Sequence, residues 1–268
     1  MAAEHTFDFD FNDQGLKGQT FILSGGSGGL GSASSYLLAR DGASLIVGYR
    51  SNRERAEALR EELQSRFGTI VELIGGDIGE ATVRERLIQA VKRIGYPLGG
   101  LVCFTGDPAR VKFDQASETD LQASMGENYI APILLARAAA EEMQSSSVSG
   151  SIVLFSTMQA IVPFESSINY AGPKVALVHA ARIMAKQWGG PSGIRVNVIA
   201  PGVNRAGMAL QSISSGKYDF FVEKAIIPRF GRPEDTARVV RLLVEPDNYL
   251  TGQVITVDGG LTLRRDIG

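Results

Sequence analysis

The stretch Ser24-Gly25-Gly26-Ser27-Gly28-Gly29-Leu30-Gly31 follows the apolar run TFIL at residues 20–23 and precedes a helical pattern over residues 29–41. It contains the spacings GxGxxG and GxxxGxG at once. Glycine permits positive φ values and lets backbone N–H groups approach an anion closely, and the following helix presents its positive N-terminus. A glycine-rich turn without a ligand would look the same in isolation, but the position between a strand and a helix predicts a pyrophosphate site. The residues expected to line it are Ser24, Gly25, Ser27, Gly29, Leu30 and Gly31.

Short apolar runs alternate with amphipathic stretches along the rest of the chain. The runs occupy residues 44–47, 70–73, 101–104, 152–155, 195–199 and 254–257, and helical patterns cover 53–67, 84–94, 121–143 and 175–188. Strands that are apolar on both faces and alternate with helices are typical of a parallel sheet covered on both sides. The chain is therefore predicted to be α/β, with one doubly wound Rossmann-type domain over residues 16–268 and a sheet of about seven strands. Residues 1–15 fit neither period and are expected to form an N-terminal arm, and residues 206–229 are expected to form the substrate loop.

The bulk composition limits the possible partners. The formal net charge is -2 and no block of like charge is present, so neither nucleic acid nor an anionic membrane is expected as a partner. The first residues do not resemble a secretory signal, and no apolar run reaches the length of a membrane span. The single cysteine, Cys103, is expected to be a packing residue and favours a reducing, cytoplasmic location. His5 and His179 lack a cluster at ligand spacing, so no metal site is expected.

The end of the second expected strand discriminates between the two nicotinamide cofactors. In dinucleotide-binding folds an Asp or Glu here accepts hydrogen bonds from the adenine ribose and repels a 2′-phosphate. This chain has Arg50, Ser51 and Asn52 instead, followed by Arg53. Arginine pairs with phosphate, and the next two side chains can donate hydrogen bonds to it. We therefore expect NADP (NADPH) rather than NAD, although two arginines at the start of a solvated helix would give the same pattern.

Tyr170 and Lys174 lie four residues apart ahead of a helical run, which places both side chains on one helix face. Pro173 between them is tolerated only in a first turn, so the helix is expected to begin just before it. A phenol with a pKa of about 10 is a poor acid–base catalyst at neutral pH unless a nearby cation stabilises its anion, and Lys174 can supply that cation. The spacing alone is common by chance, and its combination with the glycine stretch is what indicates an acid–base site.

These ordered motifs resemble the short-chain dehydrogenase/reductase family over nearly the whole chain from about Gly15. Within that family they resemble bacterial 3-oxoacyl-carrier-protein reductases and related ketoreductases. The family's glycine loop TGxxxGxG corresponds to Ser24–Gly31, with Ser24 in place of Thr, and its YxxxK motif to Tyr170 and Lys174. Further matches are the Asp-apolar adenine contact, the helix Asn, the PG turn and the final strand, which fall at Asp77-Ile78, Asn128, Pro201-Gly202 and YLTGQVITVDGG over 249–260.

The resemblance implies an NADP-dependent oxidoreductase that interconverts a ketone and an alcohol, with a 3-oxoacyl-type reductase favoured. Tyr170 would donate the proton to the carbonyl oxygen, Lys174 would lower the tyrosine pKa and hold the nicotinamide ribose, and Asn128 would anchor a relay water. Thr157 stands at the family's serine position and is expected to polarise the carbonyl, with Ser156 as the second candidate. The resemblance also implies a homotetramer that acts on a small-molecule carbonyl substrate.

Two departures from the family pattern bear on this interpretation. Where the family has NNAG, this chain has Cys103-Phe104-Thr105-Gly106, so only Gly106 remains and the asparagine contacts that brace the cofactor loop are missing. After the PG turn, Asn204 and Ala206 replace the Ile and Thr that face the nicotinamide amide. These changes leave open a second function, a dinucleotide-binding sensor or partner subunit with little catalysis. An S-adenosylmethionine-dependent transferase would share the glycine stretch but gives no role to the Tyr–Lys pair.

Overall fold

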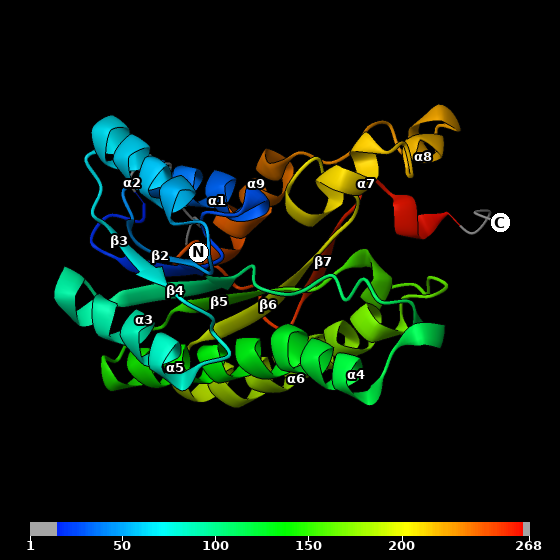
Figure 1. The fold of residues 1–268 in the computed structure, drawn as a ribbon. Helices are drawn as coiled ribbons and strands as arrows, with labels where there is room; N and C mark the ends of the chain where they lie inside the picture. Colours follow the sequence, from blue (N-terminus) through cyan, green and yellow to red (C-terminus); the bar gives the residue numbers. More distant parts are fainter. Residues whose placement is uncertain (1–14, 265–268) are drawn as a thin grey trace, which may run out of the picture.

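The computed structural model describes residues 15–264, which form one parallel sheet with helices on both faces (Figure 1). The sheet has seven strands in the order β3-β2-β1-β4-β5-β6-β7, and all neighbours are parallel. The predicted doubly wound α/β fold is therefore confirmed. Of the predicted N-terminal arm, residues 1–14 lie outside the described residues. The strands are β1 Thr20–Ser24, β2 Ser44–Tyr49, β3 Val71–Gly75, β4 Leu98–Cys103, β5 Ser151–Phe155, β6 Arg195–Pro201 and β7 Val254–Val257.

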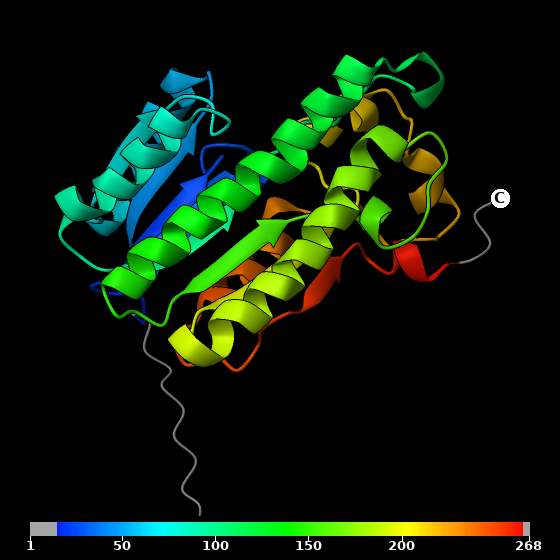
Figure 2. The same ribbon diagram turned by 90° about the horizontal axis from the view of Figure 1, so that it is seen from below.

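Helices form a layer on each face of the sheet. In Figure 1 the upper layer contains α1 Gly29–Arg40, α2 Arg53–Phe67 and α9 Pro233–Val244. The lower layer contains α3 Ala81–Ile94, α4 Glu118–Met125, α5 Ala131–Ser145 and α6 Ile168–Ser192. Figure 2 shows α5 and α6 side by side across the lower face. The short helices α7 Leu210–Ser214 and α8 Asp219–Glu223 lie in the predicted substrate loop.

The core is divided by the sheet, because alternate residues of a strand point to opposite faces. In β1, Phe21 and Leu23 pack with the α1 and α9 side of the core, whereas Ile22 packs with the α3, α5 and α6 side. All five residues of β1 are buried. Strands enclosed in this way hold their carboxyl ends in fixed positions.

The segment predicted as one helix over residues 121–143 contains a π-helical turn, Gly126–Ile130, between α4 and α5. Pro132 has no N–H, so it cannot donate the usual bond to the carbonyl of Asn128 four residues earlier. The chain instead bonds the Ala131 N–H to the Gly126 carbonyl, five residues back. Such turns are often found at functional sites, and this one carries Asn128.

Helix α6 begins earlier than expected. The prediction that the helix starts just before Pro173 was wrong, because α6 starts at Ile168 and keeps the proline inside it. Pro173 cannot donate to the carbonyl of Asn169. That carbonyl accepts the hydroxyl of Ser124 from α4 instead, so the Asn169 carbonyl still has a partner. The helix can therefore start one turn earlier and include Tyr170.

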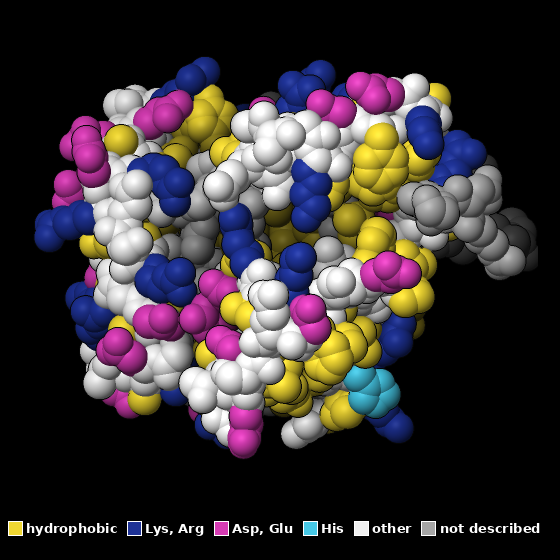
Figure 3. Space-filling view, turned by 45° about the vertical axis from the view of Figure 1, so that its right-hand side comes forward, with side chains coloured by type: hydrophobic (Ala, Val, Ile, Leu, Met, Phe, Trp, Pro, Cys, Tyr) yellow, Lys and Arg dark blue, Asp and Glu magenta, His cyan; other side chains and the backbone are white. Residues whose placement is uncertain are grey.

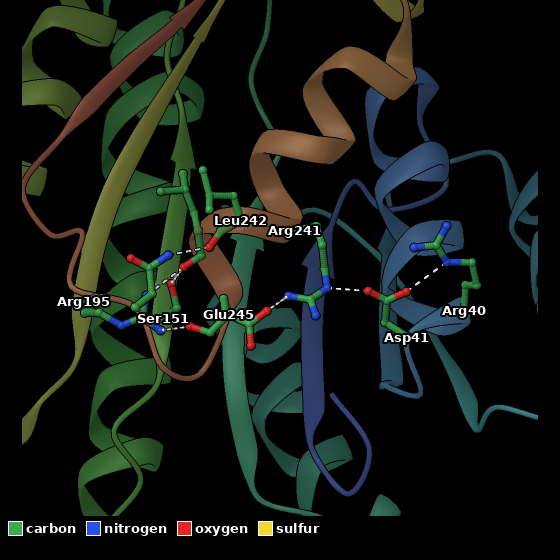
Figure 4. Close-up of polar contacts among 9 residues, drawn as sticks. Arg40, Asp41, Ser151, Arg195, Arg241, Leu242 and Glu245 are labelled. Atoms are coloured by element: carbon green, nitrogen blue, oxygen red, sulfur yellow. Dashed lines mark hydrogen bonds and ion pairs between the residues drawn. The ribbon is translucent and has the colours of Figure 1, made fainter. Parts of the chain in front are cut away.

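An ion cluster of Arg40, Asp41, Arg241 and Glu245 joins α1 to α9 at the amino-terminal edge of the sheet (Figure 4). Arg241 of α9 forms ion pairs with Asp41, just after α1, and with Glu245. Arg40 contacts the other oxygen of Asp41 at 2.9 Å. The cluster therefore links α1 and α9 on the upper face of the sheet. It lies at the opposite end of the strands from their carboxyl ends.

The end of α9 is also bonded to the first residues of β5 and β6. Arg195 donates to the carbonyls of Leu243 at 2.9 Å and Glu245 at 2.7 Å (Figure 4). Ser151 donates to the same Leu243 carbonyl at 2.7 Å. These donors satisfy carbonyls that the helix end would otherwise leave unbonded.

Candidate active site

The expected site residues gather at the carboxyl ends of the central strands. Ser24 ends β1, Cys103 ends β4, Phe155 ends β5 and Pro201 ends β6. Strands β1 and β4 are neighbours at the centre of the sheet. The chain adds β2 and β3 on one side of this pair and β5, β6 and β7 on the other, so the strand order reverses between them. Open α/β sheets bind ligands in the crevice at such a switch point. Figure 3 shows a hollow whose floor is hydrophobic and whose rim carries Lys and Arg side chains.

The glycine stretch forms a tight turn between β1 and α1. Gly25 has a φ of 80°, which glycine adopts without strain. A Cβ on Gly31 would lie 2.2 Å from the Gly25 carbonyl oxygen, so the first turn of α1 packs on the loop only because this residue is glycine. No side chain caps the start of α1. Its backbone N–H groups are therefore left to an anion.

The segment after the PG turn lies directly over this loop. A Cβ on Gly29 would be 2.5 Å from the Gly207 nitrogen and 2.8 Å from the Ala206 Cβ. Gly202 donates to the Val257 carbonyl at 3.0 Å, which ties the turn after β6 to β7. The structure thus brings the segment that follows the predicted Pro201-Gly202 turn onto the predicted pyrophosphate loop.

The altered segment Cys103–Gly106 is braced by contacts other than the family's asparagines. Thr105 Oγ1 lies 3.2 Å from Ser24 Oγ and 2.9 Å from Cys103 Sγ. The ring of Phe104 packs on that of Phe155, with centroids 4.3 Å apart. Cys103 is buried, and burial raises the pKa of its thiol. These contacts join the ends of β1, β4 and β5, so the loop is ordered without the contacts that the resemblance led us to expect.

Tyr170, Thr157 and Lys174 meet beside the end of β5. Thr157 is hydrogen-bonded to the phenol of Tyr170. Lys174 is 2% exposed, and its Nζ donates to the Phe155 carbonyl at 2.9 Å and lies 5.9 Å from the centre of the Tyr170 ring. Ser156, the second candidate for the polarising hydroxyl, donates to the Lys174 carbonyl at 3.1 Å. Its hydroxyl therefore supports the helix, while that of Thr157 faces the phenol.

Burial shifts both titrations away from their ordinary values. Burial raises the pKa of Tyr170 to about 12, the Thr157 hydrogen bond opposes the rise, and the negative charge of Asp107 adds to it. Burial lowers the pKa of Lys174 to about 8. Burial is the largest cause, so the net shift of the tyrosine pKa is upward, although Lys174 was expected to lower it. The phenol is therefore a neutral proton donor at pH 7.

Asn128 fixes the loop that follows Gly106. Its Oδ1 accepts the Asp107 N–H at 3.1 Å, and its Nδ2 donates to the Asp107 carbonyl at 3.0 Å. A Cβ on Gly106 would lie 2.7 Å from Asn128 Oδ1 and 2.9 Å from Lys174 Nζ. The side chain expected to anchor a relay water is thus bonded to the backbone of Asp107, and glycine at 106 is what allows the loop to approach the lysine.

At the adenosine end the predicted residues lie near one another but have other partners. Arg50 pairs with Glu127 at 3.2 Å, and both side chains are exposed. Asn52 caps α2 by accepting the Arg55 N–H. Ser51 lies between these two residues and is exposed.

The expected adenine contacts follow β3. Asp77 accepts the Gly79 N–H at 2.7 Å through Oδ1. The side chain of Ile78 is buried in the core, so only its backbone can face a ligand. Asp77 therefore has its second carboxylate oxygen left for a base edge.

The substrate loop packs into a separate apolar cluster, to which it contributes Phe221 and Ile227. The members of the cluster are Met158, Val203, Phe221, Ile227, Phe230 and Leu261. Met158 directly follows Thr157, so this cluster begins next to the Thr157 hydroxyl. The loop also contacts the opposite wall, where Arg110 donates to Gln211 of α7 at 2.7 Å. A substrate at Tyr170 would be enclosed by these two walls.

Sequence reasoning missed three groups at the site. Thr105 was noted only as a departure, although a hydroxyl next to Cys103 and close to Ser24 is a signal for a brace. Glu127 and Asp107 carried no local signal, because their partners Arg50 and Tyr170 are distant in sequence. Long-range pairs of this kind depend on the sheet order and not on spacing.

Among residues 15–264, no group of His, Cys, Asp and Glu side chains is arranged to hold a metal ion. Over the same residues no helix is both long and apolar enough to cross a membrane.

Comparison with known proteins identifies the family. A family model described as Enoyl-(Acyl carrier protein) reductase matches residues 25–262. The chain belongs to this family, the short-chain dehydrogenases/reductases, whose members are oxidoreductases that bind a nicotinamide dinucleotide and act on CH–OH groups.

Individual relatives extend over nearly the whole chain. A 3-oxoacyl-[acyl-carrier-protein] reductase of Thermotoga maritima is 27% identical over 249 residues, 92% of this chain and 99% of its own. A tropinone reductase homolog of Arabidopsis thaliana is 30% identical over 254 residues, 92% of this chain and 94% of its own. The structure of a short-chain dehydrogenase/reductase from Mycobacterium ulcerans superposes with a TM-score of 0.85 at 27% identity and covers 93% of this chain and 92% of that one.

The residues present fit a nicotinamide dinucleotide. The turn at Gly25–Gly31 is packed so closely that Cβ atoms at Gly29 and Gly31 would collide with neighbouring backbone, and it ends at an uncapped helix. Gly106 keeps the backbone close to Lys174, beside the phenol. The glycine turn would hold the pyrophosphate, Lys174 the nicotinamide ribose and Asp77 the adenine edge. When bound, the cofactor supplies or accepts the hydride.

Proposed function

We propose that the protein is an NADPH-dependent carbonyl reductase, with 3-oxoacyl-type ketones the first substrates to test. The observation that carries the proposal is the meeting of Tyr170, Thr157 and Lys174 beside the glycine turn at the switch point of the sheet. The Thermotoga maritima relative, a 3-oxoacyl-[acyl-carrier-protein] reductase, supports the acyl substrate. The apolar cluster of the substrate loop supports it as well.

In the proposed reaction Tyr170 donates its proton to the carbonyl oxygen as hydride reaches the carbon. The phenol is protonated at neutral pH because burial raises its pKa to about 12. Thr157 donates a second hydrogen bond to the same oxygen, and charge that develops there is stabilised by both hydroxyls. Lys174 has a pKa of about 8 and is therefore mostly cationic at pH 7. Its charge stabilises the phenolate that remains after proton transfer.

Preference for NADPH is supported by the end of β2. Arg50 and Ser51 follow Tyr49, and residues 48–53 contain no carboxylate. An arginine at this place can pair with a 2′-phosphate by charge-assisted hydrogen bonds. Arg50 is exposed and its present partner, Glu127, is also on the surface, so the guanidinium can exchange one anion for another at low cost.

The test is a fluorescence titration of the wild type and of Arg50→Ala with NADPH and NADH. We expect NADPH to bind more tightly by about tenfold or more and the preference to be lost in the variant, since charge-assisted contacts contribute about 1.5–3 kcal/mol.

A carbonyl screen then follows, with Tyr170→Phe as the control that binds cofactor but loses turnover by at least about 10²-fold. Equal affinity for the two cofactors would refute the NADP assignment. Tight binding without turnover of any carbonyl would favour the dinucleotide-binding sensor.

The proposal includes a homotetramer in the cytoplasm. The outer face of α6 carries three exposed apolar side chains, Ile168, Val175 and Ile183, at spacings of one helix face. An apolar stripe of this kind favours burial against another subunit. Light scattering coupled to size-exclusion chromatography measures the mass directly, and a monomer at micromolar concentration would refute this part.

A further inference from the structure

Two buried asparagines hold the loop that begins at Asp107, the first residue after Gly106. Asn128 bonds both the N–H and the carbonyl of Asp107, and Asn169 donates to the Val111 carbonyl at 2.8 Å. Oδ1 of Asp107 accepts the Ala109 N–H at 2.8 Å. The loop 107–111 is therefore fixed at both ends and by an internal turn, so the position of the carboxylate is defined before any substrate arrives.

Asp107 belongs to the loop that touches the Tyr170–Lys174 pair. Gly106, one residue earlier, is in close contact with Lys174 Nζ. The charge of Asp107 acts on the phenol of Tyr170. Asp107 is half-buried, and within the described residues neither an ion pair nor a hydrogen bond is found at its Oδ2. A half-buried carboxylate oxygen, held by the loop that contacts Lys174, is thus left to accept a hydrogen bond.

We propose that Asp107 determines substrate specificity by accepting a hydrogen bond from a hydroxyl or ammonium group on the carbon next to the reacting carbonyl. The inference rests on the proposed carbonyl reductase and narrows its substrate class. A ketone with only methylene groups at this place would displace water from Oδ2 and leave it unpaired, and an unpaired charged group is costly. A site built to bond a substrate O–H or N–H therefore rejects the analogue that lacks it. Among ketones of one size, 3-oxoacyl types included, those with a donor beside the carbonyl are preferred.

The test uses two pairs of ketones that differ only in the donor. 2-Hydroxyacetophenone is compared with propiophenone, in which methyl replaces the hydroxyl, and 2-(dimethylamino)acetophenone is compared with isovalerophenone, in which isopropyl replaces the ammonium. We expect the wild type to prefer the donor-bearing member of at least one pair by about tenfold in kcat/KM, mainly through KM. The pair that shows the larger ratio identifies whether the donor is a hydroxyl or a cation.

Asp107→Asn keeps the shape of the side chain and the acceptor for the Ala109 N–H but removes the charge. It is expected to lower the ratio for the ammonium pair to near one and to reduce that for the hydroxyl pair, with NADPH affinity unchanged. Asp114→Asn, an exposed carboxylate farther along the same loop, is the matched control and should leave both ratios as they are.

The outcomes separate the two proposals. If the wild type reduces both members of each pair with equal kcat/KM, or if Asp107→Asn leaves the ratios unchanged, the role of Asp107 is refuted and the reductase stands. If the wild type binds NADPH but reduces none of the four ketones nor a 3-oxoacyl thioester, the proposed function itself fails, and the substrate class inferred from it fails too.

Discussion

Two cations with little solvent exposure lie at opposite ends of the sheet and have opposite kinds of partner. At the amino-terminal edge, Arg241 is 17% exposed at its side chain and sits between the carboxylates of Asp41 and Glu245. At the carboxyl edge, Lys174 is 2% exposed, and its ammonium donates to the Phe155 carbonyl. No carboxylate within the described residues lies at ion-pair distance from it.

The difference separates what stabilises the fold from what serves the chemistry. A buried charge between two counter-charges is compensated, and removal of one partner leaves the others exposed to an apolar surrounding. A buried ammonium with only a backbone carbonyl is not compensated, so its pKa falls and the folded state becomes less stable. We therefore expect the ion cluster to increase the stability of the fold and buried Lys174, the proposed catalytic lysine, to decrease it.

Lys174→Met gives the largest effect and tests the catalytic side of this comparison. Because the pKa of Lys174 is lowered from 10.5 to about 8, the folded state binds its proton less tightly than the unfolded chain. The cost is fully present below pH 8 and disappears as pH rises to about 10.5, so stability increases with pH over this window. Without the titrating group, the variant should be more stable at pH 7 by about 3 kcal/mol and should lose turnover by about 10²-fold or more.

Urea unfolding of both proteins at pH 7, 8, 9 and 10 measures the difference. Tyr170 also titrates at high pH, but it is present in both proteins and its effect cancels. Lys186→Met, on the exposed face of the same helix, is the control and should change stability little. A variant less stable than the wild type at pH 7 would show that the bond to Phe155 outweighs the cost of burial.

Arg241→Met should have the opposite sign. It leaves Asp41, with a side chain only 7% exposed, paired with Arg40 alone. We expect a loss of about 2 kcal/mol in the free energy of unfolding, because breaking a largely buried pair leaves an uncompensated charge. Turnover and NADPH affinity should hardly change, since the cluster lies at the far end of the strands. Asp41→Asn in the Arg241→Met background should recover part of the loss.

The matched control for this variant is Arg238→Met on the same helix. Arg238 is 70% exposed at its side chain and pairs with Asp235 at 3.5 Å, so it should cost less than about 0.5 kcal/mol. If the two variants lose equal stability, helix propensity and not the ion cluster explains the change.

Features that depend on residues close in the sequence could be predicted, and features that depend on residues far apart in the sequence could not. The sheet, the glycine turn and the order of helices could be predicted because hydrophobic period and glycine spacing act locally. The start of α6 was missed because the carbonyl freed by Pro173 is satisfied by Ser124, 45 residues earlier than Asn169. The pairs Arg241–Asp41 and Arg50–Glu127 are 200 and 77 residues apart. Their partners are brought together by the parallel strand order, which no local pattern contains.

Glu127→Gln should have the smallest effect, because it concerns the exposed pair at the adenosine end. Arg50 and Glu127 are 59% and 38% exposed at their side chains, so water and salt screen the pair and breaking it costs little. If Arg50 is to bind a 2′-phosphate, as proposed, Glu127 competes with that phosphate for the guanidinium and repels it. The variant should therefore bind NADPH about threefold more tightly, with NADH affinity unchanged and with the gain lost at about 0.5 M salt. Glu118→Gln at the start of α4, the helix that leads into the π-helical turn carrying Glu127, is a control for charge. Weaker NADPH binding by Glu127→Gln would mean that the carboxylate orients Arg50 for the phosphate. The exposed pair would then hold a side chain in position, as the ion cluster does.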